Sequence, residues 1–138
     1  MLFKWGDDFC CNIQEIDKQH KKLFETGNKV YELASLDDNY DHYDEIMEIL
    51  DELRQYTIYH FNYEEKLLSD NGYDKLDTHK IEHYFFTKKL QKIGKQDIDN
   101  FQKESIMEIL TFIADWITNH ILKSDHEYKD FLISKGVV

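Results

Sequence analysis

Five histidines, one glutamate and one aspartate form a set of metal-ligating side chains spread along the chain. His60 and Glu64 lie one helical turn apart, in a stretch whose other inward-facing positions are apolar. Burying an imidazole and a carboxylate without partners costs free energy, so this pair needs a partner that offsets the loss of water. A metal ion is the strongest such partner. The other candidates are His20, His79, His83 and His120, on similar apolar faces, and Asp125, which follows His120.

The apolar residues around these histidines recur in steps of three and four, the spacing of helices that pack around a common core. With 138 residues, no proline and five glycines, the composition favours one all-α domain, residues 1–138. We expect an up-down-up-down four-helix bundle with an N-terminal arm and a short C-terminal helix. The expected elements are an arm over 1–16, Asp17 as the first N-cap, helices over 17–36, 43–69, 74–93 and 98–122, a polar turn over 37–44, and a last helix over 125–135.

The position of each candidate along its helix brings the set together. Histidines of the first and third helices lie near the helix starts, and those of the second and fourth lie near the helix ends. In an up-down-up-down bundle these four places are at the same end. A single buried histidine is more often a hydrogen-bonded core residue, but five in one layer lack partners for one another. We therefore interpret the layer as a metal site, and we expect His42 and His126, off these faces, at the surface.

Asp125 joins this layer only if the fourth helix departs from α-helical geometry. Five residues along an α-helix turn about 140° away from one face, so we expect the helix to loosen or end around Leu122 to Ser124. Seven ligands are too many for one ion, and a structural zinc site would use four, usually with cysteine. Two roughly octahedral ions sharing bridging carboxylates and one bridging oxygen would leave about one coordination position open. Ligand type alone does not separate iron from manganese, cobalt or zinc.

The net charge of −11 argues against partners that are bound through an excess of lysine and arginine, such as nucleic acid and anionic membranes. No stretch approaches the roughly 20 apolar residues of a membrane span, so we expect a soluble, cytoplasmic protein, and the charge favours a monomer. The only cysteines, Cys10 and Cys11, are adjacent, and such neighbours rarely form an unstrained disulfide. We interpret them as small, partly buried side chains in a reducing compartment rather than as a redox pair.

The complete pattern resembles that of the bacterial hemerythrins. The matching residues run from Trp5 to about Phe131 and consist of His20 within the segment IDKQH, His60-x3-Glu64, His79-x3-His83 and His120-x4-Asp125. The sequence departs from the family's pattern at Cys10-Cys11-Asn12 and at Gln14, which affects the arm and none of the ligands.

The resemblance implies a four-helix bundle around a non-haem di-iron centre that binds O2 reversibly, for storage, delivery or sensing. It implies iron ions (Fe2+/Fe3+) bridged by an oxo or hydroxo group, by Glu64 and by Asp125. One iron would be held by His79, His83 and His120. The other would be held by His20 and His60 and would bind O2 end-on as hydroperoxide. The family's apolar lining of the oxygen pocket would correspond to Phe61, Trp116, Ile117 and Ile121, which would also be core residues.

Two other functions compete with oxygen binding. A di-iron redox enzyme acting on peroxide or nitric oxide would use the same ligands, but the inward faces offer no further acid or base near the metals. Di-iron enzymes are typically rich in carboxylates, whereas this site is rich in imidazoles. Iron handling, or a signalling module that reports O2 to a partner, is the third alternative. We expect an oxygen-binding protein that is not an enzyme.

Overall fold

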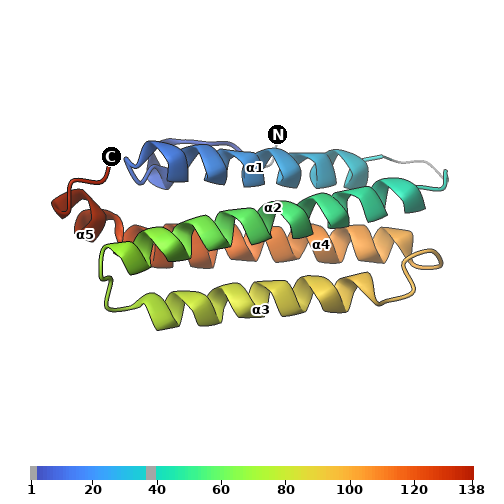
Figure 1. The fold of residues 1–138 in the computed structure, drawn as a ribbon. Helices are drawn as coiled ribbons and strands as arrows, with labels where there is room; N and C mark the ends of the chain where they lie inside the picture. Colours follow the sequence, from blue (N-terminus) through green and yellow to red (C-terminus); the bar gives the residue numbers. More distant parts are fainter. Residues whose placement is uncertain (1–2, 37–39) are drawn as a thin grey trace.

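The computed structural model describes residues 3–36 and 40–138 and consists of helices without strands in those ranges. Four long helices lie side by side, and a short helix follows at the C-terminal end (Figure 1). Their bounds are α1 Gln14–Ala34, α2 Tyr43–Asp70, α3 Leu76–Gly94, α4 Gln102–Trp116 and α5 Lys129–Ser134, with a 3-10 turn over Asp7–Phe9 and a π-helix over Ile117–Asp125. The all-α fold class and the four-helix bundle are confirmed. Part of the predicted turn, residues 37–39, lies outside the described residues.

The helices alternate in direction, and α2 and α4 also contact each other across the bundle. Helices α1 and α3 both contact α2 and α4, so α1 and α3 lie on opposite corners of the bundle. Inward positions three and four residues apart form one continuous apolar core, because that spacing keeps side chains on a single helical face. Its fully or nearly fully buried members include Leu23, Val30, Ile46, Leu53, Phe86, Ile93, Ile109 and Ile113.

A tight turn joins α2 to α3 and places their ligand candidates opposite one another. Gly72 has a φ of 73°, a left-handed conformation that glycine adopts without steric cost. The Tyr73 N–H donates to the Leu68 carbonyl at 3.0 Å, and the Gly72 N–H donates to the Ser69 carbonyl at 3.1 Å. Because the connection is short, the end of α2 and the start of α3 meet at the same end of the bundle.

The first helix begins before the predicted N-cap. Helix α1 starts at Gln14, with Ile13 in the N-cap position, so the prediction that Asp17 caps it is wrong. Asp17 instead lies within the first turn and accepts hydrogen bonds from the Cys11 N–H at 2.7 Å and the Cys10 thiol at 3.1 Å. The arm reaches Asp17 because it turns sharply at Asn12, whose φ is 61°. Its carboxylate therefore fixes the arm rather than the helix end.

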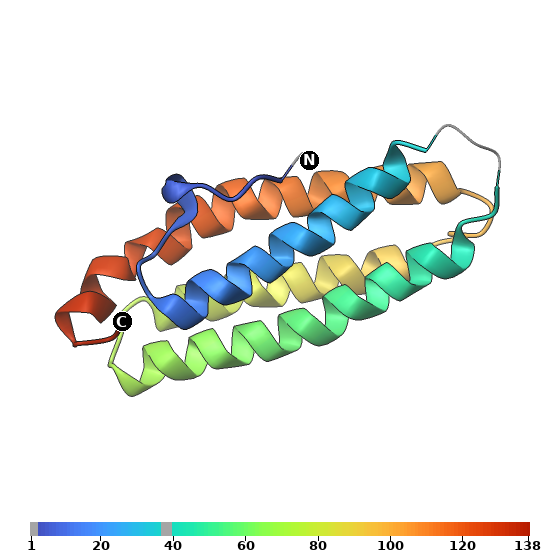
Figure 2. The same ribbon diagram turned by 90° about the horizontal axis from the view of Figure 1, so that it is seen from above.

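The N-terminal arm folds back along α1 and reaches the middle of that helix (Figure 2). The Phe3 N–H donates to Asn28 Oδ1 at 2.9 Å, and Asn28 Nδ2 donates back to the Phe3 carbonyl at 2.8 Å. Trp5 and Phe9 pack against Phe24 of α1 in edge-to-face contacts. The arm therefore covers one side of the core.

The C-terminal end differs from the prediction in one respect. The predicted last helix over 125–135 is shorter, because the π-helix continues to Asp125 and a turn precedes α5 at Lys129.

Among the described residues, every helix is too short or too polar to cross a lipid bilayer.

Candidate metal centre

All seven ligand candidates lie together at one end of the bundle core. They come from the start of α1, the end of α2, the start of α3 and the π-helix after α4, which Figure 1 shows on its left side. Each is at most 3 % exposed. The structure therefore brings together the side chains that were expected to converge. The group consists of His20, His60, Glu64, His79, His83, His120 and Asp125.

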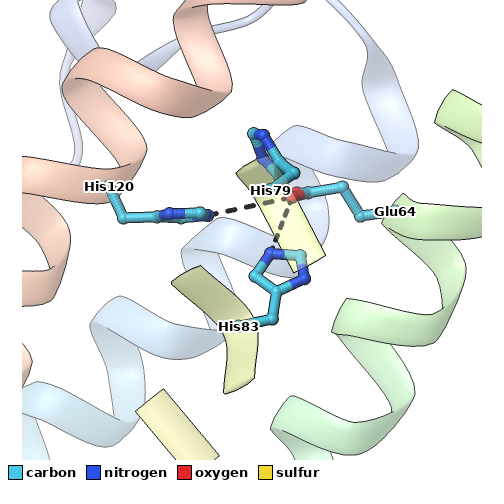
Figure 3. A group of neighbouring side chains, drawn as sticks. All are labelled: Glu64, His79, His83 and His120. Carbon is cyan, nitrogen blue, oxygen red and sulfur yellow. Dashed lines mark hydrogen bonds and ion pairs between the residues drawn. The ribbon is translucent and has the colours of Figure 1, made fainter. Parts of the chain in front are cut away.

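Three histidines surround one oxygen of the Glu64 carboxylate. Glu64 Oε1 lies 2.9 Å from His79 Nε2, 3.1 Å from His83 Nε2 and 3.9 Å from His120 Nε2. Figure 3 shows the three rings converging on this carboxylate. These four residues form one group that could hold a metal ion.

The other Glu64 oxygen faces a second pair of histidines. Glu64 Oε2 lies 3.3 Å from His60 Nε2 and 3.7 Å from His20 Nε2. Together with Asp125, these residues form a second group that could hold a metal ion. Glu64 belongs to both groups, and its two oxygens face different sets of histidines.

Asp125 reaches both sets because of the π-helix. Its Oδ1 lies 2.7 Å from His79 Nε2 and 2.9 Å from His120 Nε2, while its Oδ2 lies 3.0 Å from His20 Nε2. Hydrogen bonding from residue i to i+5 places residues five apart near one another, unlike in an α-helix. The expected loosening of the helix is thus confirmed, although it begins at Ile117, earlier than predicted.

Charges at the centre are strongly coupled. Burial alone would raise the pKa of Glu64 and Asp125, but the surrounding histidines outweigh it and hold both carboxyl pKa values well below their usual range. Burial would lower the pKa of His79, yet its contacts with the two carboxylates raise that pKa to about 9. Burial lowers the pKa of His60 despite its contact with Glu64. A metal-free centre therefore holds protons on imidazoles where a cation would otherwise balance the carboxylates.

The donor set fits a pair of first-row transition metals. All five histidines direct Nε2 toward the two carboxylates, and the Nε2 atoms of His20 and His120 are buried without a well-formed hydrogen bond. Asp125 Oδ2 is buried in the same way. Nitrogen and carboxylate ligands without thiolate match the preferences of such ions. The residues present therefore fit the two ions that the ligand count predicts.

Three polar side chains that the sequence analysis did not single out support the histidines from outside. Gln19 Oε1 lies 2.6 Å from His60 Nδ1, and Glu65 Oε2 lies 2.8 Å from His83 Nδ1. Glu82 Oε2 lies 3.4 Å from His120 Nδ1. Because Gln19 and Glu65 offer oxygens to Nδ1, the Nδ1 atoms of His60 and His83 donate their protons to them. Glu82 Oε2 and His120 Nδ1 lie close together without forming a hydrogen bond. Gln19, Glu65 and Glu82 each adjoin a ligand candidate in the sequence, a signal that could have identified them.

Tyr128 is a further contact that sequence reasoning missed. Its side chain is completely buried, and its hydroxyl donates to Glu64 Oε2 at 3.1 Å. Burial, together with the neighbouring carboxylates, raises the pKa of this phenol well above its ordinary value. The phenol therefore stays neutral and donates a hydrogen bond that orients the shared Glu64 carboxylate. Tyr128 follows Asp125 by three residues, about one helical turn.

Three of the predicted lining residues, Phe61, Ile117 and Ile121, belong to the core cluster, and Trp116 is partly buried and packs against it. The Phe61 ring stacks on His83 with centroids 3.9 Å apart, and the Trp116 ring stacks on His120 at 4.0 Å. Ile117 and Ile121 are buried, with 4 % and 0 % exposed. Phe61 also lies 5.7 Å from His60, so it contacts both sets of histidines.

The remaining histidines and cysteines lie outside the cluster of ligands. His42 and His126 are partly buried rather than at the surface, so that prediction is wrong in degree. His42 Nδ1 lies 2.9 Å from Glu45 Oε1 near the start of α2, far along the chain from the ligands. Both thiols are free; Cys10 is partly buried, as expected, whereas Cys11 is completely buried.

Comparison with known proteins agrees with the geometry. Residues 11–132 match the hemerythrin HHE cation binding domain family. A bacteriohemerythrin from Clostridium acetobutylicum is 46% identical over 129 residues, which cover 94% of this chain and 100% of that protein. A bacteriohemerythrin from Pseudomonas aeruginosa is 30% identical, over 91% of this chain and 78% of that protein. A hemerythrin-like protein from Naegleria gruberi is 31% identical, over 94% of this chain and 93% of that protein.

The matched segment contains every ligand candidate, and the first of these relatives aligns over its whole length. Family and relatives together support an oxygen-binding protein with non-haem iron rather than an enzyme. The chain belongs to the hemerythrin family.

Proposed function

We propose that the chain binds O2 reversibly at a centre of two non-haem iron ions in the bundle core. The observation that carries this proposal is the Glu64 carboxylate, whose two oxygens face two separate sets of histidines. Such a carboxylate can bridge two ions. When bound, the two irons would supply the two electrons, and a bridging hydroxide would supply the proton, that reversible O2 binding as hydroperoxide uses.

Each ligand candidate has a proposed role. His79, His83 and His120 hold one ion, and His20 and His60 hold the other, at which one coordination position stays open for O2. Glu64 and Asp125 bridge the two ions. This division is supported by the contacts of Asp125, whose Oδ1 faces two histidines of the first set and whose Oδ2 faces His20. The end-on mode of O2 binding stays a prediction, as do the monomeric state and the cytoplasmic location.

The apolar residues next to the histidines exclude water. Phe61, Trp116, Ile117 and Ile121 belong to or pack against the same core cluster and offer no groups that could hold a water molecule at the open position, apart from the indole N–H. Exclusion of water and anions slows irreversible oxidation of the iron pair. We therefore assign these four residues to the lining of the oxygen pocket.

The test of this proposal is purification without air, followed by metal analysis and visible spectroscopy. We expect two irons per chain and a colour that develops when O2 is admitted to the reduced protein and disappears when O2 is removed. Rapid, irreversible oxidation would contradict the proposal and favour a redox enzyme acting on peroxide or nitric oxide. Fewer than two irons per chain in the fully loaded protein would contradict the two-metal centre itself.

The pocket lining has a separate test. Trp116→Ala and Ile117→Ala should oxidise irreversibly faster than the wild type, because each change admits water to the centre. Ile109→Ala is the matched control for Ile117→Ala. It removes the same kind of buried side chain from α4, in the part of the bundle core that contains no ligand candidates. Equal oxidation rates in wild type and both lining variants would refute the assignment.

A further inference from the structure

We propose that the side chains behind the histidines make the two metal positions unequal. Glu65 and Glu82 strengthen the three-histidine position, and Gln19 keeps the two-histidine position weaker, so that the two ions bind in separate steps. This inference rests on the proposed two-metal centre and concerns the positioning residues around it.

Carboxylates support two histidines of the stronger position. Glu65, on α2, accepts the Nδ1 proton of His83 at 2.8 Å. Glu82, on α3, lies 3.4 Å from His120 Nδ1, and its other oxygen accepts a hydrogen bond from Ser124 at 2.8 Å. A histidine whose outer N–H is donated to a carboxylate becomes a more basic ligand, and its ring is held in a fixed orientation. Two negative charges behind this position also favour a cation directly.

An uncharged amide supports the weaker position. Gln19 is 2 % exposed, and its Oε1 accepts the Nδ1 proton of His60 at 2.6 Å. Its Nε2 donates to Glu15 Oε1 at 3.0 Å, which fixes the orientation of the amide. Behind His20, Nδ1 is buried without a hydrogen-bond partner among the described residues. An amide raises the basicity of an imidazole less than a carboxylate does.

The inequality suits a centre at which one position exchanges a ligand. The two-histidine position has fewer protein ligands and no carboxylate hydrogen-bonded behind its histidines, so it would hold an ion less tightly. The three-histidine position then serves as the fixed half of the pair.

The experiment is a titration of metal-free protein with Co2+ under argon, in competition with a chelator, with the ligand-field absorption of Co2+ recorded at each addition. We expect two resolved binding steps in the wild type. Glu65→Gln should weaken the first step by roughly tenfold or more, the usual effect of altering an outer hydrogen bond to a ligand, and should change the absorption that develops in that step. Glu82→Gln, which removes the negative charge 3.4 Å from His120 Nδ1, should weaken the same step.

A charge swap tests Gln19 without altering the net charge. In Glu15→Gln/Gln19→Glu the carboxylate moves from the half-buried position at 15 to the position behind His60, and Glu15→Gln alone is its control. The swap should strengthen the second step by about tenfold and shift only the absorption of the second ion. Glu108→Gln, which removes a carboxylate paired with Lys89 and remote from the ligands, should leave both steps unchanged.

The outcomes separate this inference from the proposed function. If the wild type binds fewer than two Co2+ ions at saturation, the two-metal centre fails and this inference fails with it. If two ions bind but all variants weaken or strengthen both steps equally, the centre stands and the inequality is wrong. Thermal unfolding of each metal-free variant identifies changes that arise only from loss of folded structure.

Discussion

At the end of the bundle opposite the ligands, the inward positions of α2 are occupied by Ile46, Leu50 and Leu53, all at most 6 % exposed. Farther along the same helix, the same face carries His60 and Glu64, which are equally buried. One half of the helix thus buries apolar side chains, and the other half buries groups that lose hydration without gaining the hydrophobic effect. Helix α3 shows the same division, with His79 and His83 in its first half and Leu90 and Ile93 in its second.

This difference indicates that the two halves contribute differently to stability. The apolar half stabilises the bundle whether or not metal is present, since burial of apolar surface does not depend on a ligand. In the polar half, carboxylates and imidazoles are buried next to one another. Metal binding would offset the free-energy cost of burying them. Stability and metal binding should therefore respond to different substitutions.

Glu64→Ala should have the largest effect, because this carboxylate belongs to both groups that could hold an ion. Losing the shared ligand should reduce the metal content from two ions toward none. It should also abolish the stabilisation by metal, which for a folded-state ligand at about 1,000 times its dissociation constant amounts to about 4 kcal/mol. Metal analysis and unfolding with and without a chelator measure both effects. Glu48→Ala, exposed on the same helix, is the control, and two tightly bound ions in Glu64→Ala would contradict the bridging role.

Ile109→Ala tests the apolar half. Ile109 is 2 % exposed, so the substitution should lower the free energy of unfolding by about 2–5 kcal/mol through lost burial and a residual cavity. The metal content should remain that of the wild type. Denaturant unfolding and metal analysis test the two statements separately. Ile81→Ala, at a position that is 55 % exposed, should have little effect, and loss of metal in Ile109→Ala would show that the two halves are not independent.

Gly27→Ala concerns the arm that covers α1. A Cβ atom at position 27 would lie 2.7 Å from Cδ2 of the Phe3 ring, closer than carbon atoms pack. The Phe3 ring would have to move, so we expect a destabilisation of about 1–3 kcal/mol, measured by thermal or denaturant unfolding. Gly94→Ala is a matched control in α3, because a Cβ there meets nothing within 4 Å. Equal stability in both variants would mean that the arm is not packed on Gly27.

The smallest expected effect is a change in the reactivity of the Cys10 thiol, which lies at the border of the metal-binding half. Its hydrogen bond to Asp17, together with burial, raises the pKa of the Cys10 thiol. A raised pKa leaves less thiolate at neutral pH, so alkylation by iodoacetamide should be slow there and should accelerate above pH about 9. Asp17→Asn keeps an oxygen acceptor but removes the negative charge, so it should lower this pKa and speed alkylation at neutral pH. Mass spectrometry of the alkylated protein gives the rates, and an unchanged pH profile would exclude the influence of Asp17.

The helices, their alternation in direction and the end of the bundle at which the ligands meet could all be predicted from residue spacing. Helical spacing restricts each histidine to an inward face, and short connections fix the direction of each helix. Residue spacing also predicted that the helix must deviate before Asp125, because five residues do not return to one face of an α-helix.

Which atoms face one another could not be predicted in this way and depends on the packed fold. That Glu64 directs each oxygen to a different set of histidines depends on side-chain torsions in the packed core, and spacing along one helix does not specify them. The contacts of Tyr128 with Glu64 and of Gln19 with His60 join different elements. The arm likewise reached Asp17 through a left-handed Asn12, which replaced the predicted N-cap with a tertiary hydrogen bond. Local patterns determine which face a residue occupies, whereas partners across the core depend on how all helices pack.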